Sequence, residues 1–316
     1  MGGIIIRRLA SAVPIMLIVS VITFGMIHLI PGDPAVAIAG LTATADQIAN
    51  IRHDLGLDQP VLTQLWRWYG NLLRGDLGRS LLLGQPVVQV MFQRLPVTLA
   101  LAAYALVLTL ILGLSSGIVA ALRQNTWIDQ AAMVFAMVGI SLPNFWLGLL
   151  MIILFAVDLR WLPTGGYIAL SADPLGWLAT STMPAISLAL LLTGLLARIT
   201  RSTMLEVLRQ DYIRTARAKG LPNRVVVLKH ALANALIPIT TVVGIIVSLL
   251  ISGSVVTETL FSIPGVGQLL TQAVLNRDYP MVQGGLLITT FLLVLINIAV
   301  DVCYALLDPR VRYDGA

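Results

Sequence analysis

Long uncharged stretches separated by shorter polar segments dominate the chain. Three of them lack Asp, Glu, Lys and Arg altogether, and they lie between Arg94 and Arg123, between Gln130 and Asp158, and between His230 and Glu258. Each exceeds the roughly 20 apolar residues that cross the hydrocarbon layer of a membrane. We predict an all-α, polytopic membrane protein with six transmembrane helices, at about residues 9–30, 97–121, 131–157, 180–198, 236–257 and 283–306.

The spacing of these spans divides the chain into three parts. Residues 1–30 are expected to form an N-terminal transmembrane helix, residues 31–96 an external loop region, and residues 97–316 a core membrane domain with five transmembrane helices. The external region contains Trp66, Trp68 and Tyr69. Since aromatic side chains favour the boundary between membrane and water, we expect short helices lying at that boundary. The only long internal loop expected is 199–235.

The basic residues indicate the orientation of the chain. With the N-terminus in the cytoplasm, thirteen of the 20 lysines and arginines fall on the inner side. The remaining seven lie mostly in the long first loop, where the positive-inside rule is weaker. Both termini are therefore expected to be cytoplasmic.

Composition excludes several classes of protein. With 58% hydrophobic and 11% charged residues, the chain is not an ordinary soluble protein. Its two lysines, Lys219 and Lys229, do not lie in a phosphate-binding P-loop motif, so no ATPase is expected on this chain. A single cysteine, Cys303, and three scattered histidines predict no metal site, no internal disulfide and no catalytic site.

The loop 199–235 carries the strongest pattern. Residues 202–219 contain no Gly or Pro, and Leu205, Leu208, Tyr212 and Ala216 recur at helical spacing, which predicts one helix with one apolar face. Gly220-Leu221-Pro222 ends that helix, and residues 223–234 form a second short segment. Two interpretations remain open: a basic helix attracted to anionic lipid, or a rigid helix pair that fits a groove on a cytoplasmic partner.

The same loop resembles the coupling loop of permease subunits of ABC importers in the dipeptide and oligopeptide branch. The matching residues are Asp211-Tyr212-Ile213-Arg214-Thr215-Ala216-Arg217-Ala218-Lys219-Gly220, His230-Ala231-Leu232 and Asn234-Ala235-Leu236-Ile237-Pro238. Further matches are Pro31-Gly32-Asp33-Pro34, Leu55-Gly56-Leu57-Asp58-Gln59-Pro60, Gly75-Asp76-Leu77-Gly78, Pro264-Gly265-Val266-Gly267, Arg277-Asp278-Tyr279-Pro280 and Asp308-Pro309-Arg310. Arg214-Thr215-Ala216 stands where the general importer pattern has Glu-Ala-Ala, as in the peptide branch.

This resemblance implies a type I ABC importer permease-like fold in a bacterial inner membrane. It implies an ATP-driven, binding-protein-dependent importer that moves di- or oligopeptides, or a small solute such as glutathione, a nickel complex or an opine, by alternating access. The partners it implies are a second homologous permease, two ATPase subunits that hold ATP and Mg, an external solute-binding protein and membrane lipid, with no nucleic acid. The residues it assigns to contact with the ATPase are Asp211, Tyr212, Arg214, Thr215, Ala216, Ala218, Lys219, Gly220 and Leu221.

Small and ionisable residues inside the spans offer further candidates. Gly244, Ser248 and Ser252 repeat every four residues, which is typical of close helix packing, while in the resembled family the corresponding helix borders the translocation path. Glu258 and Asp301 lie near the ends of spans, and we interpret both as structural.

Two other functions are weighed against the importer. An ion-coupled secondary transporter would show paired ionisable residues or broken helices at mid-membrane and an internal repeat, and none is visible in the sequence. A membrane-embedded hydrolase would need a nucleophile with a base or a metal cluster. His28 and Cys303 have no visible partner for such chemistry.

Overall fold

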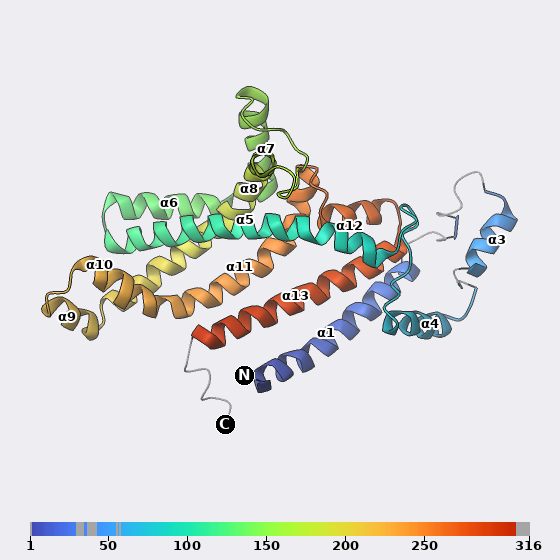
Figure 1. Cartoon of the computed structure of the whole chain (residues 1–316), viewed down its shortest axis with the longest axis horizontal. Helices are drawn as coiled ribbons and strands as arrows, with labels where there is room; N and C mark the ends of the chain where they lie inside the picture. The colour runs from blue at the N-terminus through green and yellow to red at the C-terminus, as the bar shows by residue number, and fades with distance from the viewer. Residues whose placement is uncertain (1, 30–34, 37–42, 55, 57, 308–316) are drawn as a thin grey trace. The chain divides into compact units, whose positions relative to one another are not determined.

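The computed structural model describes residues 2–29, 35–36, 43–54, 56 and 58–307, and these residues are helical almost throughout (Figure 1). Four helices are long and apolar enough to cross a membrane: α5 (Val87–Leu122), α8 (Pro174–Leu208), the continuous helix Asn223–Leu260, and Tyr279–Val300 within α13 (Tyr279–Leu307). A bent pair, Trp127–Ser141 and Asn144–Asp158, makes a fifth if it is counted as one span. In the described part of the chain, the only extended pairing is an isolated bridge between Arg79 and Pro86.

These helices confirm the all-α membrane fold, whereas the number of six spans stays a prediction. The first expected span corresponds to α1 (Gly2–Leu29), a helix of 28 residues in which Ala10–Met26 forms a shorter apolar segment. Two of the matched motifs, Pro31-Gly32-Asp33-Pro34 and Asp308-Pro309-Arg310, lie outside the described residues.

The contacts divide the chain into two compact units. One contains residues 97–264 and the segment from Ile296 onward, and the other contains residues 3–96 and 265–295. Both α5 and α13 therefore contribute residues to each unit. The loop 199–235 lies entirely within the first unit.

Helix α8 is the central element of the first unit. It begins at Pro174, where the side chain of Asp173 accepts a hydrogen bond from the amide of Leu175 at 3.0 Å. This cap satisfies one of the free amides of the first turn, and proline suits the first helical position. α8 packs against α6 (Trp127–Ser141) and α11 (Leu232–Leu260), and it is the most buried of the four long helices.

Glycines let the neighbouring backbones approach α8 closely. A Cβ atom at Gly194 of α8 would lie 2.2 Å from the carbonyl oxygen of Ala136, and one at Gly139 of α6 would lie 2.7 Å from that of Leu190. On the α5 side, a Cβ at Gly117 would lie 2.6 Å from the carbonyl oxygen of Ala197. Small residues at such crossings are the usual means of packing helices in membranes, because lipid supplies no hydrophobic force between them.

The third expected span, 131–157, is not a single helix. α6 ends at Ser141, and α7 (Asn144–Met151) with the π-helical segment η1 (Ile152–Asp158) continues at an angle of 101°. Pro143 explains the break, since a residue that precedes proline is driven out of the helical region. Leu142 accordingly has an extended backbone, with φ −90° and ψ 127°.

The boundaries of the expected loop 199–235 also differ. α8 continues ten residues past the expected end at 198 and stops at Leu208, so the expected continuous helix over 202–219 is wrong. The helix that contains the fifth expected span begins at Asn223, through α10 (Asn223–Val225) and the π-helical segment η2 (Val226–Ala231) into α11. Only residues 209–222 lie between the two long helices, and they include α9 (Asp211–Ala218).

The second unit contains the expected short helices of the region 31–96. They are α3 (Ala45–Asp54) and α4 (Val61–Leu73). The ring of Trp68 in α4 lies against that of Phe24 in α1, tilted by 46° with centroids 5.7 Å apart, and the Tyr69 hydroxyl lies 2.7 Å from that of Ser20. Two of the three expected boundary aromatics therefore pack on α1, while Trp66 is 75% exposed.

Buried Asp278 organises the loop that precedes α5. Its carboxylate accepts hydrogen bonds from the Ser80 hydroxyl at 2.5 Å and from the amides of Leu81 and Leu82 at 3.1 and 3.3 Å. The start of α5, which follows this loop in the chain, packs with α12 (Val266–Leu275) and the start of α13 in one apolar core. The matched motif that contains Asp278 is thus a structural anchor.

Replacing Gly194 with alanine should destabilise the protein. The added methyl group meets the backbone of α6, which must move, and overpacking of this kind costs about 1–3 kcal/mol. The matched control is Gly253→Ala, where the nearest atom, on Leu188, lies at an ordinary 3.6 Å. Thermal unfolding in detergent should show a lower Tm for Gly194→Ala only, and equal Tm values for the two variants would contradict the close approach.

Candidate functional site: the α9 helix and its turn

Helix α9 folds back on the segment that follows it. Ile213 is fully buried and Ala216 is 8% exposed, and α9 contacts η2, where Val226 and Ala231 are also fully buried. The two short helical segments therefore pack on each other through small and aliphatic side chains. The expected arrangement of helix, tight turn and helix is present between α8 and α11.

Gly220 closes α9 in the left-handed conformation, with φ +78°. Its amide donates to the Arg217 carbonyl at 2.9 Å, and the Leu221 amide donates to the Ala216 carbonyl at 3.4 Å. This pair of bonds is the Schellman motif, which satisfies the last carbonyls of a helix and favours glycine at this position. A Cβ atom at Gly220 would meet no described residue of this chain within 4 Å, so the surface beside the turn is open among those residues.

Most of the residues assigned to partner contact lie on the open side of α9. The exposed ones are Asp211, Tyr212, Arg214, Thr215, Ala218, Lys219, Gly220 and Leu221. Ala216 instead belongs to the buried side. The expected apolar face was wrong at Tyr212, which is 44% exposed, because the break after Leu208 shifts the helical phase and turns Ile213 inward.

The polar groups on this open side interact weakly with one another. Arg214 and Asp211 form an ion pair at 3.4 Å, but both side chains are exposed, and such pairs contribute little stability. Partial burial of the Tyr212 hydroxyl raises its pKa above the usual value. The phenol therefore keeps its proton at neutral pH and can donate a hydrogen bond to a partner.

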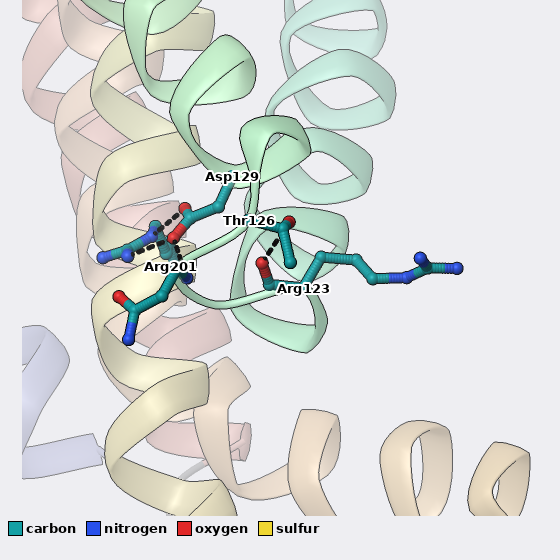
Figure 2. Close-up of polar contacts among 5 residues, drawn as sticks. Arg123, Thr126, Asp129 and Arg201 are labelled. Atoms are coloured by element: carbon teal, nitrogen blue, oxygen red, sulfur yellow. Dashed lines mark hydrogen bonds and ion pairs between the residues drawn. The ribbon is translucent and has the colours of Figure 1, made fainter.

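Asp129 and Arg201 tie the start of α6 to α8 close to this site (Figure 2). The guanidinium Nε and Nη2 atoms donate to the two carboxylate oxygens at 2.5 and 2.6 Å. The Asp129 side chain is 5% exposed and that of Arg201 26%. The Asn125 amide donates to the same carboxylate at 3.0 Å from a left-handed residue with φ +64°. Paired, two-point bonds of this kind fix both distance and orientation.

Sequence reasoning missed this pair. Asp129 and Arg201 are 72 residues apart, and each has a local explanation in the sequence. Asp129 lies in the first turn of α6, where a carboxylate complements the helix dipole, and Arg201 is one of many basic residues near a span end.

Of the described residues, no group of three or more His, Cys, Asp or Glu side chains could hold a metal ion.

The residues considered for the translocation path have different surroundings. Gly244 lies against α13, because a Cβ there would be 2.3 Å from Val300. Ser248 donates to the Asn297 amide oxygen at 2.7 Å, and Ser252 is exposed. Glu258 is fully buried and accepts a hydrogen bond from Thr98 at 2.7 Å, as a structural carboxylate would. The side chains of His28, Asp301 and Cys303 lie outside the described residues.

Fold and site together define a class of protein: a multi-pass helical membrane protein with an exposed short helix closed by a glycine turn, and with no P-loop motif in its sequence. Comparison with known proteins gives the family. The family described as "Binding-protein-dependent transport system inner membrane component" matches residues 113–313, and the family of the corresponding N-terminal part matches residues 1–102. The chain belongs to this family, and it is an ABC importer permease of the inner membrane, not an enzyme. Such permeases work with ATPase subunits and a binding protein.

Curated relatives match nearly the whole chain. A protein named as a peptide transport system permease in Brucella abortus (strain 2308) is 51% identical over 314 residues, which are 99% of this chain and 100% of that protein. The glutathione transport system permease of Salmonella paratyphi A is 43% identical, covering 98% of each chain. The dipeptide transport system permease of Alkalihalophilus pseudofirmus is 40% identical, covering 97% of this chain and 98% of that protein.

A solved structure shares the fold. A chain of the methionine ABC transporter MetNI, in an inward-facing conformation, matches with a TM-score of 0.57 at 19% identity and covers 70% of this chain and 97% of that chain. This likeness confirms the type I importer permease fold expected from the sequence. The broken helix at Pro143 was not expected, but membership of this family does not favour the secondary transporter with which broken helices were associated.

Replacing Asp129 with asparagine should lower the stability of the protein. The change leaves the Arg201 guanidinium partly buried without its counter-charge, and losing one partner of such a pair costs roughly 2–5 kcal/mol, near the lower end because Arg201 retains some water contact. Asp58→Asn, which removes the exposed pair with His53 and lies outside the residues assigned to the ATPase, serves as the control. Thermal unfolding of the purified complex should give a lower Tm for Asp129→Asn alone, and an unchanged Tm would show that the pair is not a stabilising clamp.

Proposed function

We propose that this chain pairs with a second, homologous permease to enclose a passage, and that two ATPase subunits dock on the open side of α9. The observation that carries the proposal is the closed turn at Gly220, which presents an exposed helix face and an open surface beside it. A rigid surface of this kind loses little conformational freedom on binding. The ATPase contacts are assigned to the nine residues named above, with Ala216 supporting the face from its buried side.

Movement of α9 would act on two long helices at once. Only Arg209 and Gln210 separate α9 from α8, and α9 packs on η2, which continues into α11. ATP binding and hydrolysis in the partners would therefore change the positions of α8 and α11 together. We assign this coupled movement to the switch between inward-facing and outward-facing states.

Peptides are the proposed substrate class. This rests on the relatives, whose names refer to transport of peptides, dipeptides and glutathione. Glutathione is itself a small peptide, so one chemical class covers all three. We propose that Ser248 and Ser252 border the passage, whereas Gly244 allows the close contact between α11 and α13.

The alternative that residues 209–222 form only a lipid-attracted basic segment accounts for their charge. It does not account for the close packing of α9 on η2 or for the glycine in a left-handed turn. A lipid surface imposes no such shape, whereas a protein groove does.

Replacing Gly220 with valine tests the docking role. A β-branched side chain at φ +78° is strained by about 1–2 kcal/mol, and it would also project into the space that a partner must occupy. We expect insertion in the membrane to be unchanged, and co-purification of the ATPase subunits and ATP-dependent peptide uptake in proteoliposomes to be lost.

The control for this variant is Gly75→Val. Gly75 has the same φ of +78° and nothing within 4 Å of a Cβ atom, but it lies after α4, far along the chain from the turn. It should retain the ATPase subunits. Normal ATPase recovery and uptake with Gly220→Val would refute the docking role, and equal loss with both variants would attribute the effect to backbone strain alone.

We propose that both termini and the α9 turn lie in the cytoplasm, because this orientation places thirteen of the 20 basic residues inside. Single cysteines at Gln85 and Ser202, both exposed, report the two sides in a Cys303→Ala background. Ser80 is unsuitable, because it is 2% exposed and bonded to Asp278. An impermeant maleimide should label Gln85→Cys in intact cells and Ser202→Cys only after lysis, and the reverse pattern would invert the topology.

A further inference from the structure

A cavity of about 550 Å³ lies where α5, α8 and α9 end. Three arginines from three different segments line it: Arg123 after α5, Arg209 after α8, and Arg217 in the last turn of α9. The amide side chains of Gln124 and Asn223 line the same cavity. All of these residues belong to the unit that contains the α9 turn.

The three guanidinium groups have no acidic partner in the part of the chain that the structure describes. Ion pairs in that part of the chain include those of His53 with Asp58, Arg201 with Asp129 and Arg214 with Asp211. A basic residue at a helix C-terminus complements the helix dipole, and this explains one charge at each helix end. It does not explain why three charges of the same sign face one cavity, where they repel one another.

The remaining lining of the cavity is apolar. Leu122, Leu205 and Leu208 come from the last turns of α5 and α8, both of which are apolar enough to span a membrane. The cavity thus adjoins the end of the uncharged run of α5, where Arg123 directly follows Leu122. On α8, Arg198 and Arg201 already precede Leu205 and Leu208. Phospholipids have the same order of groups as the end of α5, with acyl chains followed by a phosphate.

We propose that this cavity binds the phosphate group of an anionic phospholipid. Arginine is suited to phosphate because its planar guanidinium donates two parallel hydrogen bonds to two oxygens. The Gln124 and Asn223 amides add uncharged donors, and the leucines contact the start of the acyl chains. Because α9 contributes Arg217, a bound lipid links the α9 turn to the ends of α5 and α8.

The test uses the complete transporter purified with its partner subunits. Native mass spectrometry and exchange into nanodiscs measure retention of phosphatidylglycerol against phosphatidylcholine. We expect wild type to retain phosphatidylglycerol selectively, and Arg123→Gln/Arg209→Gln to bind it about tenfold more weakly. Arg224→Gln is the matched control, since Arg224 is an exposed arginine of α10, next to Asn223, that does not line the cavity, and it should behave as wild type.

Two further measurements distinguish a lipid phosphate from a soluble phosphate and from misfolding. Inorganic phosphate is titrated against the transporter in nanodiscs of pure phosphatidylcholine. Binding of inorganic phosphate that depends on Arg123 and Arg209 would support the phosphate site with a soluble anion as its ligand. Arg123→Lys/Arg209→Lys keeps the charge and should retain part of the selectivity, which separates binding from misfolding.

Other outcomes overturn the proposal. Equal retention of phosphatidylglycerol by wild type and by Arg123→Gln/Arg209→Gln would exclude the cavity as a lipid site. If Arg123→Gln/Arg209→Gln kept its lipid but lost the ATPase subunits, these arginines would instead pair with acidic side chains of the ATPase. The lipid measurement does not require transport, so its result stands apart from that of the peptide uptake experiment.

Discussion

Close contact between helix backbones is the constraint on which the first unit depends. In lipid, the apolar side chains of two helices gain nothing by leaving the solvent, so association relies on close packing and on hydrogen bonds. Gly194, Gly139 and Gly117 supply the close packing, because each lies where a neighbouring carbonyl leaves no room for a methyl group. α8 is held in this way on two sides, and its 35 residues form one uninterrupted helix from Pro174 to Leu208. The contacts made within the membrane thus also fix the position of the segment beyond it.

The charged pair of Asp129 and Arg201 acts where these glycine contacts end. It lies near the end of α8, only ten residues before α9 begins, and it attaches the start of α6 to that end. The following loop is short, and α9 is packed against η2 rather than free. Three interactions in sequence along the chain therefore make the site rigid. They are the backbone contacts of α8, the two-point ion pair of Asp129 with Arg201, and the closed turn at Gly220.

The sequence predicted the features that depend on local chemistry. Uncharged runs located the long helices, and Gly220 with Pro222 located the turn, because glycine and proline restrict the backbone in a known way. The missed features depend on partners distant in sequence or on competition between neighbours. Residues 131–157 were expected to form one span, yet the helix breaks at Pro143. No Gly or Pro marks the end of α8, so the sequence could not predict the break at Arg209 and Gln210. Without that break, it also could not predict which side of α9 is buried. Asp129 and Arg201 pair through the tertiary fold alone.

The loop anchored by Asp278 has less conformational freedom than most surface loops. Four groups bond to one buried carboxylate: the Ser80 hydroxyl and the amides of Leu81, Leu82 and Met281. Ordering a free loop costs about 1–2 kcal/mol for each residue. In this loop the conformational entropy is already lost when the protein folds, while Leu82 and Leu83 at its tip remain 56% and 48% exposed. A protein that binds to this tip would contact a surface already in its final shape. Its association rate would then be limited by the mutual orientation of the two surfaces and not by rearrangement of the loop.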